Sequence, residues 1–151
     1  AGGIAHETEV GMVQQVLRQA DSAVALYAAP ENRGRYAAQM ADMLDGLTRG
    51  ARPGSDHQLA YVRGLISFAS SEQHVALMAG LLDGGTTIDG LVVDTDLRWS
   101  LLRRLVVLGQ AGTGEIDSEQ RLDDTAAGRL NAAACRAATF FRSFGTPALW
   151  T

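Results

Sequence analysis

Histidines and acids that could support hydrolysis are spread along the chain without forming a known motif. His6 and Glu7 begin the H-E-x-x-H pattern of zinc metallopeptidases, but Val10 stands where the second metal-binding histidine is needed. We therefore expect His6 and Glu7 to lie in a mobile N-terminal segment. His57 and His74 are not accompanied by a cluster of acids or cysteines at ligand spacing, so a hydrogen-bonded or partly exposed histidine is expected at each position.

The other nucleophiles and acids also lack the neighbours that catalysis requires. No serine occupies a G-x-S-x-G turn, and the glycine pair 84–85 follows a helical segment instead of opening one, unlike a phosphate-binding loop. Asp123 and Asp124 precede Thr125 at a predicted helix start, where solvated capping accounts for them. Cys135 has no second cysteine to pair with and is predicted to be a small buried residue. The sequence thus predicts no catalytic residue and no metal ligand.

The strongest structural signal is the segment 92–109, VVDTDLRWSLLRRLVVLG. Asp94 is placed to cap the first amides of a helix, and Arg103 and Arg104 approach its negative end. Its apolar residues fall into two stripes, Leu97, Leu101, Leu105 and Leu108 in one and Trp99, Leu102 and Val106 in the other. A helix with so wide an apolar arc is expected to pack on two sides, with Trp99 in the core.

The helical period continues over nearly the whole chain, without convincing strand alternation. Helices are predicted over residues 9–28, 30–50, 56–69, 70–83, 94–108, 114–122 and 126–140. The predicted caps are Ser55 or Asp56 for the third helix, Ser70 with Gln73 for the fourth and Thr125 for the last. Residues 86–93 could form a short strand, but a loop that inserts Ile88 and Leu91 among the helices is favoured.

The buried faces of the first two helices follow from the same period. For the first helix the predicted core residues are Val10, Val13, Leu17, Ala20, Val24 and Tyr27. For the second they are Tyr36, Met40, Met43, Leu44 and Leu47. Short helices joined by tight loops pack as antiparallel pairs, and stacked pairs form an α-solenoid. The predicted fold is therefore all-α, with about seven short helices in antiparallel pairs.

Length and composition set further bounds. A chain of 151 residues with 46% hydrophobic and 20% charged residues is typical of one globular domain, predicted to span 1–151. A net charge of −4 argues against a nucleic-acid partner. No apolar run is long enough for a membrane span, and the N-terminal residues do not resemble a signal peptide. We expect a cytoplasmic protein, in keeping with its lone cysteine.

Four sequence blocks resemble a known family. They are GSDHQLAYVRGL (54–65), ALMAGLLDG (76–84), IDGLVVDTDLRWSLLRRL (88–105) and, after EID (115–117), DDTAAGRLNAAACRAA (123–138). They are similar to the C-terminal helical domain of aminopeptidase N in the M1 zinc metallopeptidase family, especially its actinobacterial members. The resemblance covers residues 7–138 and implies a HEAT-like α-solenoid. The remaining residues, TFFRSFGTPALWT (139–151), diverge from the family and reflect a different reading frame, an appended tail or a divergent terminus.

The resemblance implies a non-catalytic part of such an enzyme. Zinc and the H-E-x-x-H motif belong to the catalytic domain of the parent, so no cofactor is expected in this chain and it should be inactive alone. The domain would cap the active-site cavity and restrict or contact peptide substrates, with the catalytic domain as its partner. Arg98 is the candidate contact for a peptide carboxylate; the alternative is an ion pair between Arg98 and Asp94 one turn earlier.

Other functions remain open at this stage. The main rival is a free-standing α-helical scaffold that binds a protein partner, and a weaker one is an all-α enzyme that uses His57 and nearby acids. A solenoid end without its neighbours leaves an apolar face uncovered, so self-association of the isolated chain is also expected.

Overall fold

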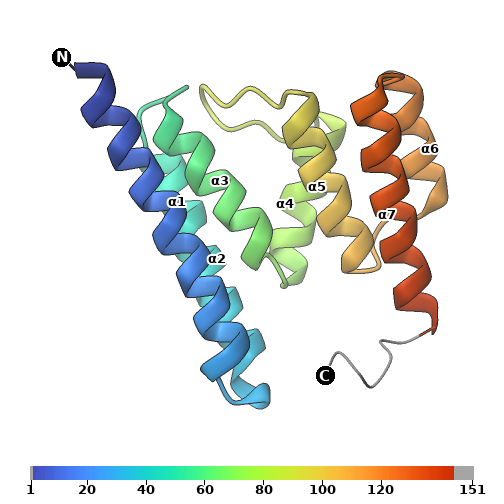
Figure 1. Cartoon of the computed structure of the whole chain (residues 1–151), viewed down its shortest axis with the longest axis horizontal. Coiled ribbons are helices and arrows are strands. Elements are labelled where there is room, and N and C mark those ends of the chain that lie inside the picture. The colour runs from blue at the N-terminus through green and yellow to red at the C-terminus, as the bar shows by residue number, and fades with distance from the viewer. Residues whose placement is uncertain (1, 145–151) are drawn as a thin grey trace. The chain divides into compact units, whose positions relative to one another are not determined.

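Seven helices and no strand form the part of the chain that the structure, a computed structural model, describes: residues 2–144, with side chains for 9–24 and 26–144 (Figure 1). The helices are α1 (Gly2–Tyr27), α2 (Pro30–Gly50), α3 (Asp56–Phe68), α4 (Glu72–Asp83), α5 (Thr95–Val107), α6 (Thr113–Leu122) and α7 (Ala126–Phe144). The predicted all-α class is confirmed. Residues 86–93 form a loop, in which Ile88 is buried and Leu91 is half-buried.

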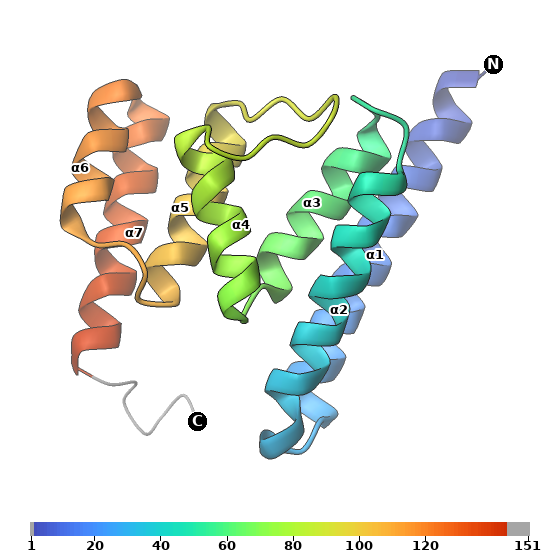
Figure 2. The same cartoon turned by 180° about the vertical axis from the view of Figure 1, so that it is seen from behind.

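The helices group into two compact units. One unit consists of residues 1–76 and 86–92, and the other of residues 77–85 and 93–151. In the first unit α1, α2 and α3 pack together, and in the second α7 packs against both α5 and α6. Helices that follow one another within a unit run antiparallel, as Figures 1 and 2 show. The solenoid arrangement and the single-domain interpretation of 1–151 stay predictions.

Side chains predicted to cap helices do so in three cases. In each, an oxygen accepts a hydrogen bond from the backbone amide three residues later, which satisfies a donor that the helix leaves unpaired. The pairs are Ser55 Oγ with the Gln58 amide at 3.2 Å, Asp94 Oδ1 with the Leu97 amide at 2.9 Å and Thr125 Oγ1 with the Gly128 amide at 3.0 Å.

Several predicted boundaries are wrong. α1 begins at Gly2, so the backbone of His6 and Glu7 is helical; their side chains lie outside the described residues. The cap of α4 is Ser71 instead of Ser70: α4 begins at Glu72, and the Ser71 hydroxyl accepts a hydrogen bond from the His74 amide at 3.2 Å. α7 extends to Phe144 instead of ending at residue 140, while residues 145–151 of the divergent tail lie outside the described part.

The predicted core of the first two helices is also partly wrong. Tyr27 is 87% exposed, and Tyr36, Met43 and Leu47 are exposed as well. Of the predicted residues of α2, Leu44 is confirmed as buried, and α2 also buries Ala41 and Thr48. Periodicity alone could not distinguish the two apolar arcs of α2, of which packing in the described chain covers one.

In the second unit the core forms around α5, as predicted. Both of its stripes are buried, apart from the half-buried Leu108 at its end. The cluster joins residues from α5, α6 and α7, namely Trp99, Leu102, Val106, Ile116, Ala132 and Cys135. The predictions for Trp99 and Cys135 are confirmed.

Candidate functional site

Arg98, the candidate substrate contact, is bound inside the second unit. Its Nε and Nη2 atoms each donate to one carboxylate oxygen of Glu119 at 2.7 Å, and Nη1 donates to the Leu82 carbonyl at 2.9 Å. The Glu119 side chain is 6% exposed and that of Arg98 is 30% exposed. This bidentate contact fixes both side chains and links α5 to α6. The bond to the Leu82 carbonyl links α5 to the end of α4.

The expected alternative, an ion pair between Arg98 and Asp94, is wrong. The Asp94 carboxylate caps the Leu97 amide, while Arg98 reaches across to α6. The hydrogen bonds to Glu119 raise the pKa of Arg98, against the opposing effect of burial, so the guanidinium is charged throughout the usual pH range. Its role as a peptide contact stays a prediction.

Trp99, the next residue, anchors a second polar network. Its indole Nε1 donates to Asp123 Oδ2 at 2.8 Å, and the Thr125 hydroxyl donates to Asp123 Oδ1 at 2.7 Å. These bonds, that from Thr125 first, lower the pKa of Asp123. Asp123 is buried, so the prediction that it is a solvated capping residue is wrong. Asp124 is exposed and pairs with Arg129 at 3.0 Å, as a solvated residue should.

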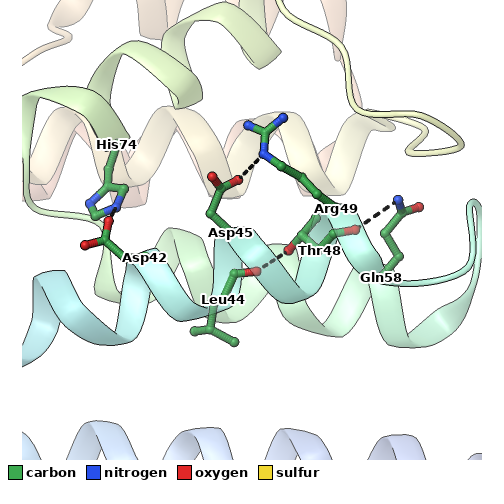
Figure 3. Close-up of polar contacts among 7 residues, drawn as sticks. All are labelled: Asp42, Leu44, Asp45, Thr48, Arg49, Gln58 and His74. Carbon is green, nitrogen blue, oxygen red and sulfur yellow. Dashed lines mark hydrogen bonds and ion pairs between the residues drawn. The ribbon is translucent and has the colours of Figure 1, made fainter.

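The loop and turn residues of the first unit are held by Gln58. This side chain is 2% exposed. Its Nε2 atom donates to the Thr48 carbonyl at 3.3 Å, drawn in Figure 3, and to the Asp89 carbonyl at 2.8 Å, while Oε1 accepts the Gly54 amide at 2.9 Å. The side-chain amide of Gln58 therefore hydrogen-bonds to backbone groups of α2, of the 52–54 turn and of the 86–92 loop. Gly90 fits here because a Cβ atom would collide with Pro53 and Gly54.

A serine, a histidine and an aspartate do meet in the first unit. His74 Nδ1 lies 2.8 Å from Ser71 Oγ. Its Nε2 lies 2.9 Å from Asp42 Oδ1, and Figure 3 draws this second contact. Catalysis would need a reachable base and a free nucleophile. Here His74 is 2% exposed, and the Ser71 hydroxyl already caps α4. The group tethers α4 to α2, and the expectation of a hydrogen-bonded histidine is confirmed for His74.

A groove of ≈ 270 Å³ lies between α1 and α3. Its polar lining includes Arg18, Asp21, Arg63 and Ser67, and Phe68 closes one side. The Ser67 hydroxyl donates its proton to the carbonyl of Arg63 in its own helix at 3.2 Å, and not to a side chain that could act as a base. The groove therefore offers charge and an apolar wall, but no nucleophile paired with a base.

In the described part of the chain, no three His, Cys, Asp or Glu side chains are grouped so as to hold a metal ion. None of the helices described has the length and apolar character that crossing a bilayer requires.

Comparison with known proteins shows the family of this chain. A family model described as the ERAP1-like C-terminal domain matches residues 1–140. The chain belongs to this family. It is also 42% identical, over 136 residues, to aminopeptidase N of Streptomyces lividans, a match that covers 90% of this chain and 16% of that protein. The predicted resemblance to the C-terminal domain of aminopeptidase N is confirmed, and the chain spans about one-sixth of this curated relative's length.

Several of the polar networks draw residues from the blocks that carry the family resemblance. Gln58 lies in the 54–65 block, Arg98 and Trp99 in the 88–105 block, and Asp123 in the 123–138 block. Sequence reasoning missed Gln58, Glu119 and the buried role of Asp123. Of these, Gln58 gave the available signal, because it stands three positions after a capping serine and directly before the apolar residues Leu59 and Ala60.

Proposed function

We propose that this chain is the non-catalytic C-terminal domain of a zinc-dependent M1 aminopeptidase, a hydrolase whose chemistry resides elsewhere in the enzyme. The family match supports this proposal. The observation that carries it is that the polar side chains of the resemblance blocks, Gln58, Arg98 and Asp123 among them, are bound to other parts of the same fold. Such residues build a rigid wall and leave no reactive group poised for catalysis.

The domain's partner in this proposal is the catalytic domain of the same enzyme. Exposed apolar residues on α1 and α2 support a large contact of this kind, since soluble proteins rarely leave such a group uncovered. They are Met12, Val16, Leu26, Tyr27, Tyr36, Met43 and Leu47. Covered by the rest of the enzyme, the helices would cap its active-site cavity and limit the size of peptides that enter.

Arg98 remains our candidate contact for the carboxylate of a peptide substrate. An arginine has five N–H groups, and three of those of Arg98 are used by Glu119 and Leu82. The side chain is 30% exposed, so the two remaining N–H groups could meet an anion that approaches from solvent. The peptide would share this guanidinium with Glu119, which predicts a modest contribution to affinity.

The first experiment separates this proposal from a free-standing scaffold. The reading frame upstream of the codon for Ala1 is sequenced, and the purified chain is assayed on amino-acid amides with and without zinc. We expect an upstream segment that encodes H-E-x-x-H and no hydrolysis by the chain alone. A start codon directly before Ala1 would support the scaffold, and zinc-dependent hydrolysis by the chain would support the all-α enzyme.

The second experiment tests Arg98 in the longer enzyme. Arg98→Gln should raise KM more for peptides with a free C-terminal carboxylate than for the same peptides with an amidated C-terminus, because loss of the ion pair with Glu119 affects both kinds of peptide alike. Arg103→Gln is the matched control, because Arg103 is exposed on the same helix and binds Asn131 at 2.8 Å. An equal change for both kinds of peptide would mean that Arg98 serves the fold alone.

We also propose a cytoplasmic location, which the buried free thiol of Cys135 favours by matching a reducing compartment. Fractionation of cells with an antibody against the chain tests it, and recovery outside the cytoplasm would refute it.

A further inference from the structure

The last helix carries two apolar faces, of which one is covered. The inner face of α7 buries Gly128, Ala132 and Cys135. The outer face is formed by exposed residues, Leu130, Ala133, Ala134, Ala137, Phe140, Phe141 and Phe144, which we call the outer stripe. Its four large side chains are 54% to 75% exposed, and the ring centroids of Phe140 and Phe144 lie 4.5 Å apart.

The spacing of the outer stripe is that of a helix-to-helix seam. Leu130, Ala137 and Phe144 recur every seven residues, and Ala133 and Phe140 occupy the intermediate positions of the same repeat. This pattern places side chains along one line of a helix and is the one by which two helices pack lengthwise. The family match ends at residue 140, so Phe141 and Phe144 lie beyond it.

Two of the three arginines of α7 are paired with acids. Arg136 pairs with Asp117 at 2.6 Å and Arg129 with Asp124 at 3.0 Å, both within the second unit. A second helix that approached the stripe would therefore meet compensated charges at these two positions.

From the seam and its order of large and small residues, we propose that the outer stripe is an interface by which two copies of this chain pair, with their α7 helices antiparallel. The proposal concerns the chain itself and does not rest on its role in an aminopeptidase.

The order of side-chain sizes selects the antiparallel arrangement. With Ala137 opposite Ala137 at a two-fold axis, Ala133 faces Phe141 and Ala134 faces Phe140, so that each ring fills the space beside an alanine. In a parallel pair, alanines would face alanines and phenylalanines would face phenylalanines, which leaves a gap at one end and crowding at the other. The stripe is thus complementary to itself, as a two-fold interface must be.

The buried area indicates a weak dimer. The exposed rings and methyl groups amount to roughly 500 Å² per copy, so pairing would bury about 1,000 Å² in total, the lower limit for a specific interface. An interface of this size is expected to give a Kd on the order of 10–100 µM, because association entropy offsets much of the gain. Helices elsewhere in the chain could add to it.

Sedimentation equilibrium of the full 151-residue chain tests the proposal with two arginine variants. Ala137→Arg places like charges together at the two-fold axis and should raise the dimer Kd at least about 100-fold. Ala23→Arg is the matched control, since Ala23 is an exposed alanine on α1 and lies on the helix side that carries Met12 and Val16. Ala23→Arg should leave the Kd unchanged. Loss of the dimer in Ala23→Arg, with Ala137→Arg unaffected, would overturn the proposal in favour of the face on α1.

Cysteine cross-linking tests the antiparallel register. Ala137→Cys should form a disulfide-linked dimer on mild oxidation, because the two positions meet at the axis. Leu130→Cys should not, because antiparallel pairing places each copy of position 130 beside Phe144 of the other, about 21 Å from its counterpart, far beyond disulfide reach. The wild type controls for the buried Cys135. Efficient cross-linking of Leu130→Cys would overturn the antiparallel arrangement.

The segment 145–151 is the competing occupant of the stripe. Its large apolar residues are Leu149 and Trp150, too few to cover the four large side chains of the outer stripe. A chain that ends at Phe144 should therefore dimerise with the wild-type Kd. A monomeric wild type at about 1 mM, well above the expected Kd, together with a dimeric shortened chain would show that the segment covers the stripe and would overturn the proposal.

Discussion

Gly128 offers the sharpest test of the network around Trp99. A Cβ atom at this position would collide with the backbone oxygen of Asp123 and would lie 2.6 Å from its Cγ and 2.7 Å from its Oδ2. The neighbouring atoms are a backbone carbonyl and a carboxylate that Trp99 and Thr125 already hold, so they cannot move aside freely. Gly128→Ala must therefore displace α7 or break this network.

The magnitude follows from two opposing effects. Replacing glycine by alanine in a helix ordinarily stabilises it by up to about 1 kcal/mol. Forcing an extra carbon into a filled site costs about 1–3 kcal/mol, and the misplaced Asp123 carboxylate adds to that cost. We expect Gly128→Ala to lower the free energy of unfolding by about 1–3 kcal/mol. Gly114→Ala should raise it by up to about 1 kcal/mol, because no atom lies within 4 Å of the added Cβ.

Urea unfolding measures both changes in the same unit. Trp99 fluorescence reports on the second unit once Trp150→Phe removes the other tryptophan, and circular dichroism at 222 nm follows helix content. Opposite signs for the two alanine variants would support the crowding at Asp123. A Gly128→Ala chain as stable as Gly114→Ala would refute the argument, since it would mean that the site has room for a methyl group.

Three further predictions concern ionisable groups. Arg98→Ala should lower the free energy of unfolding by about 3–5 kcal/mol, because it leaves the buried Glu119 carboxylate unpaired, and replacing both residues by apolar ones should recover much of the loss in urea titrations. The lowered pKa of Asp123 means that its contribution is complete above the pKa of the unfolded chain and is lost as pH falls through the folded value; Asp123→Asn should flatten this acid limb in thermal unfolding at a series of pH values. Burial raises the pKa of the Cys135 thiol, so a thiol reagent at pH 8 should label it slowly in the folded chain and rapidly in urea, and fast labelling of the folded chain would contradict its burial.

Much of the fold could be predicted because its rules are local. Ser55, Asp94 and Thr125 mark helix starts through hydrogen bonds to amides three residues later, and Pro30 marks one through its fixed φ. Both signals are legible in the order of residues. The two stripes of α5 were equally readable, because burial on both sides leaves a wide apolar arc. The Ser70 cap was wrong by one position, within the ordinary ambiguity of two adjacent serines.

The polar networks could not be predicted because their members are distant in sequence. The sequence offered Asp94, four residues away, as the ion-pair partner of Arg98. The structure instead pairs Arg98 with Glu119, which is 21 residues away on another helix. Trp99 and Asp123 are separated by 24 residues, and nothing in their neighbourhoods indicates the other. The prediction that Tyr36 and Met43 are buried was wrong for a related reason. An apolar arc shows that a helix can pack against a partner, but it does not show which arc the fold covers.

The route of the chain between the two units has a consequence for biosynthesis. Residues 77–85 belong to the second unit, yet the chain then returns to the first for residues 86–92, where the Asp89 carbonyl receives its bond from Gln58. During translation the first unit is therefore incomplete until Val92 has left the exit tunnel of the ribosome. At that point residues 77–85 have already emerged, but the rest of the second unit has not. Nascent chains halted before that residue should be open to protease in α2 and α3, and no single cut can divide the gene into two halves that each encode a whole unit.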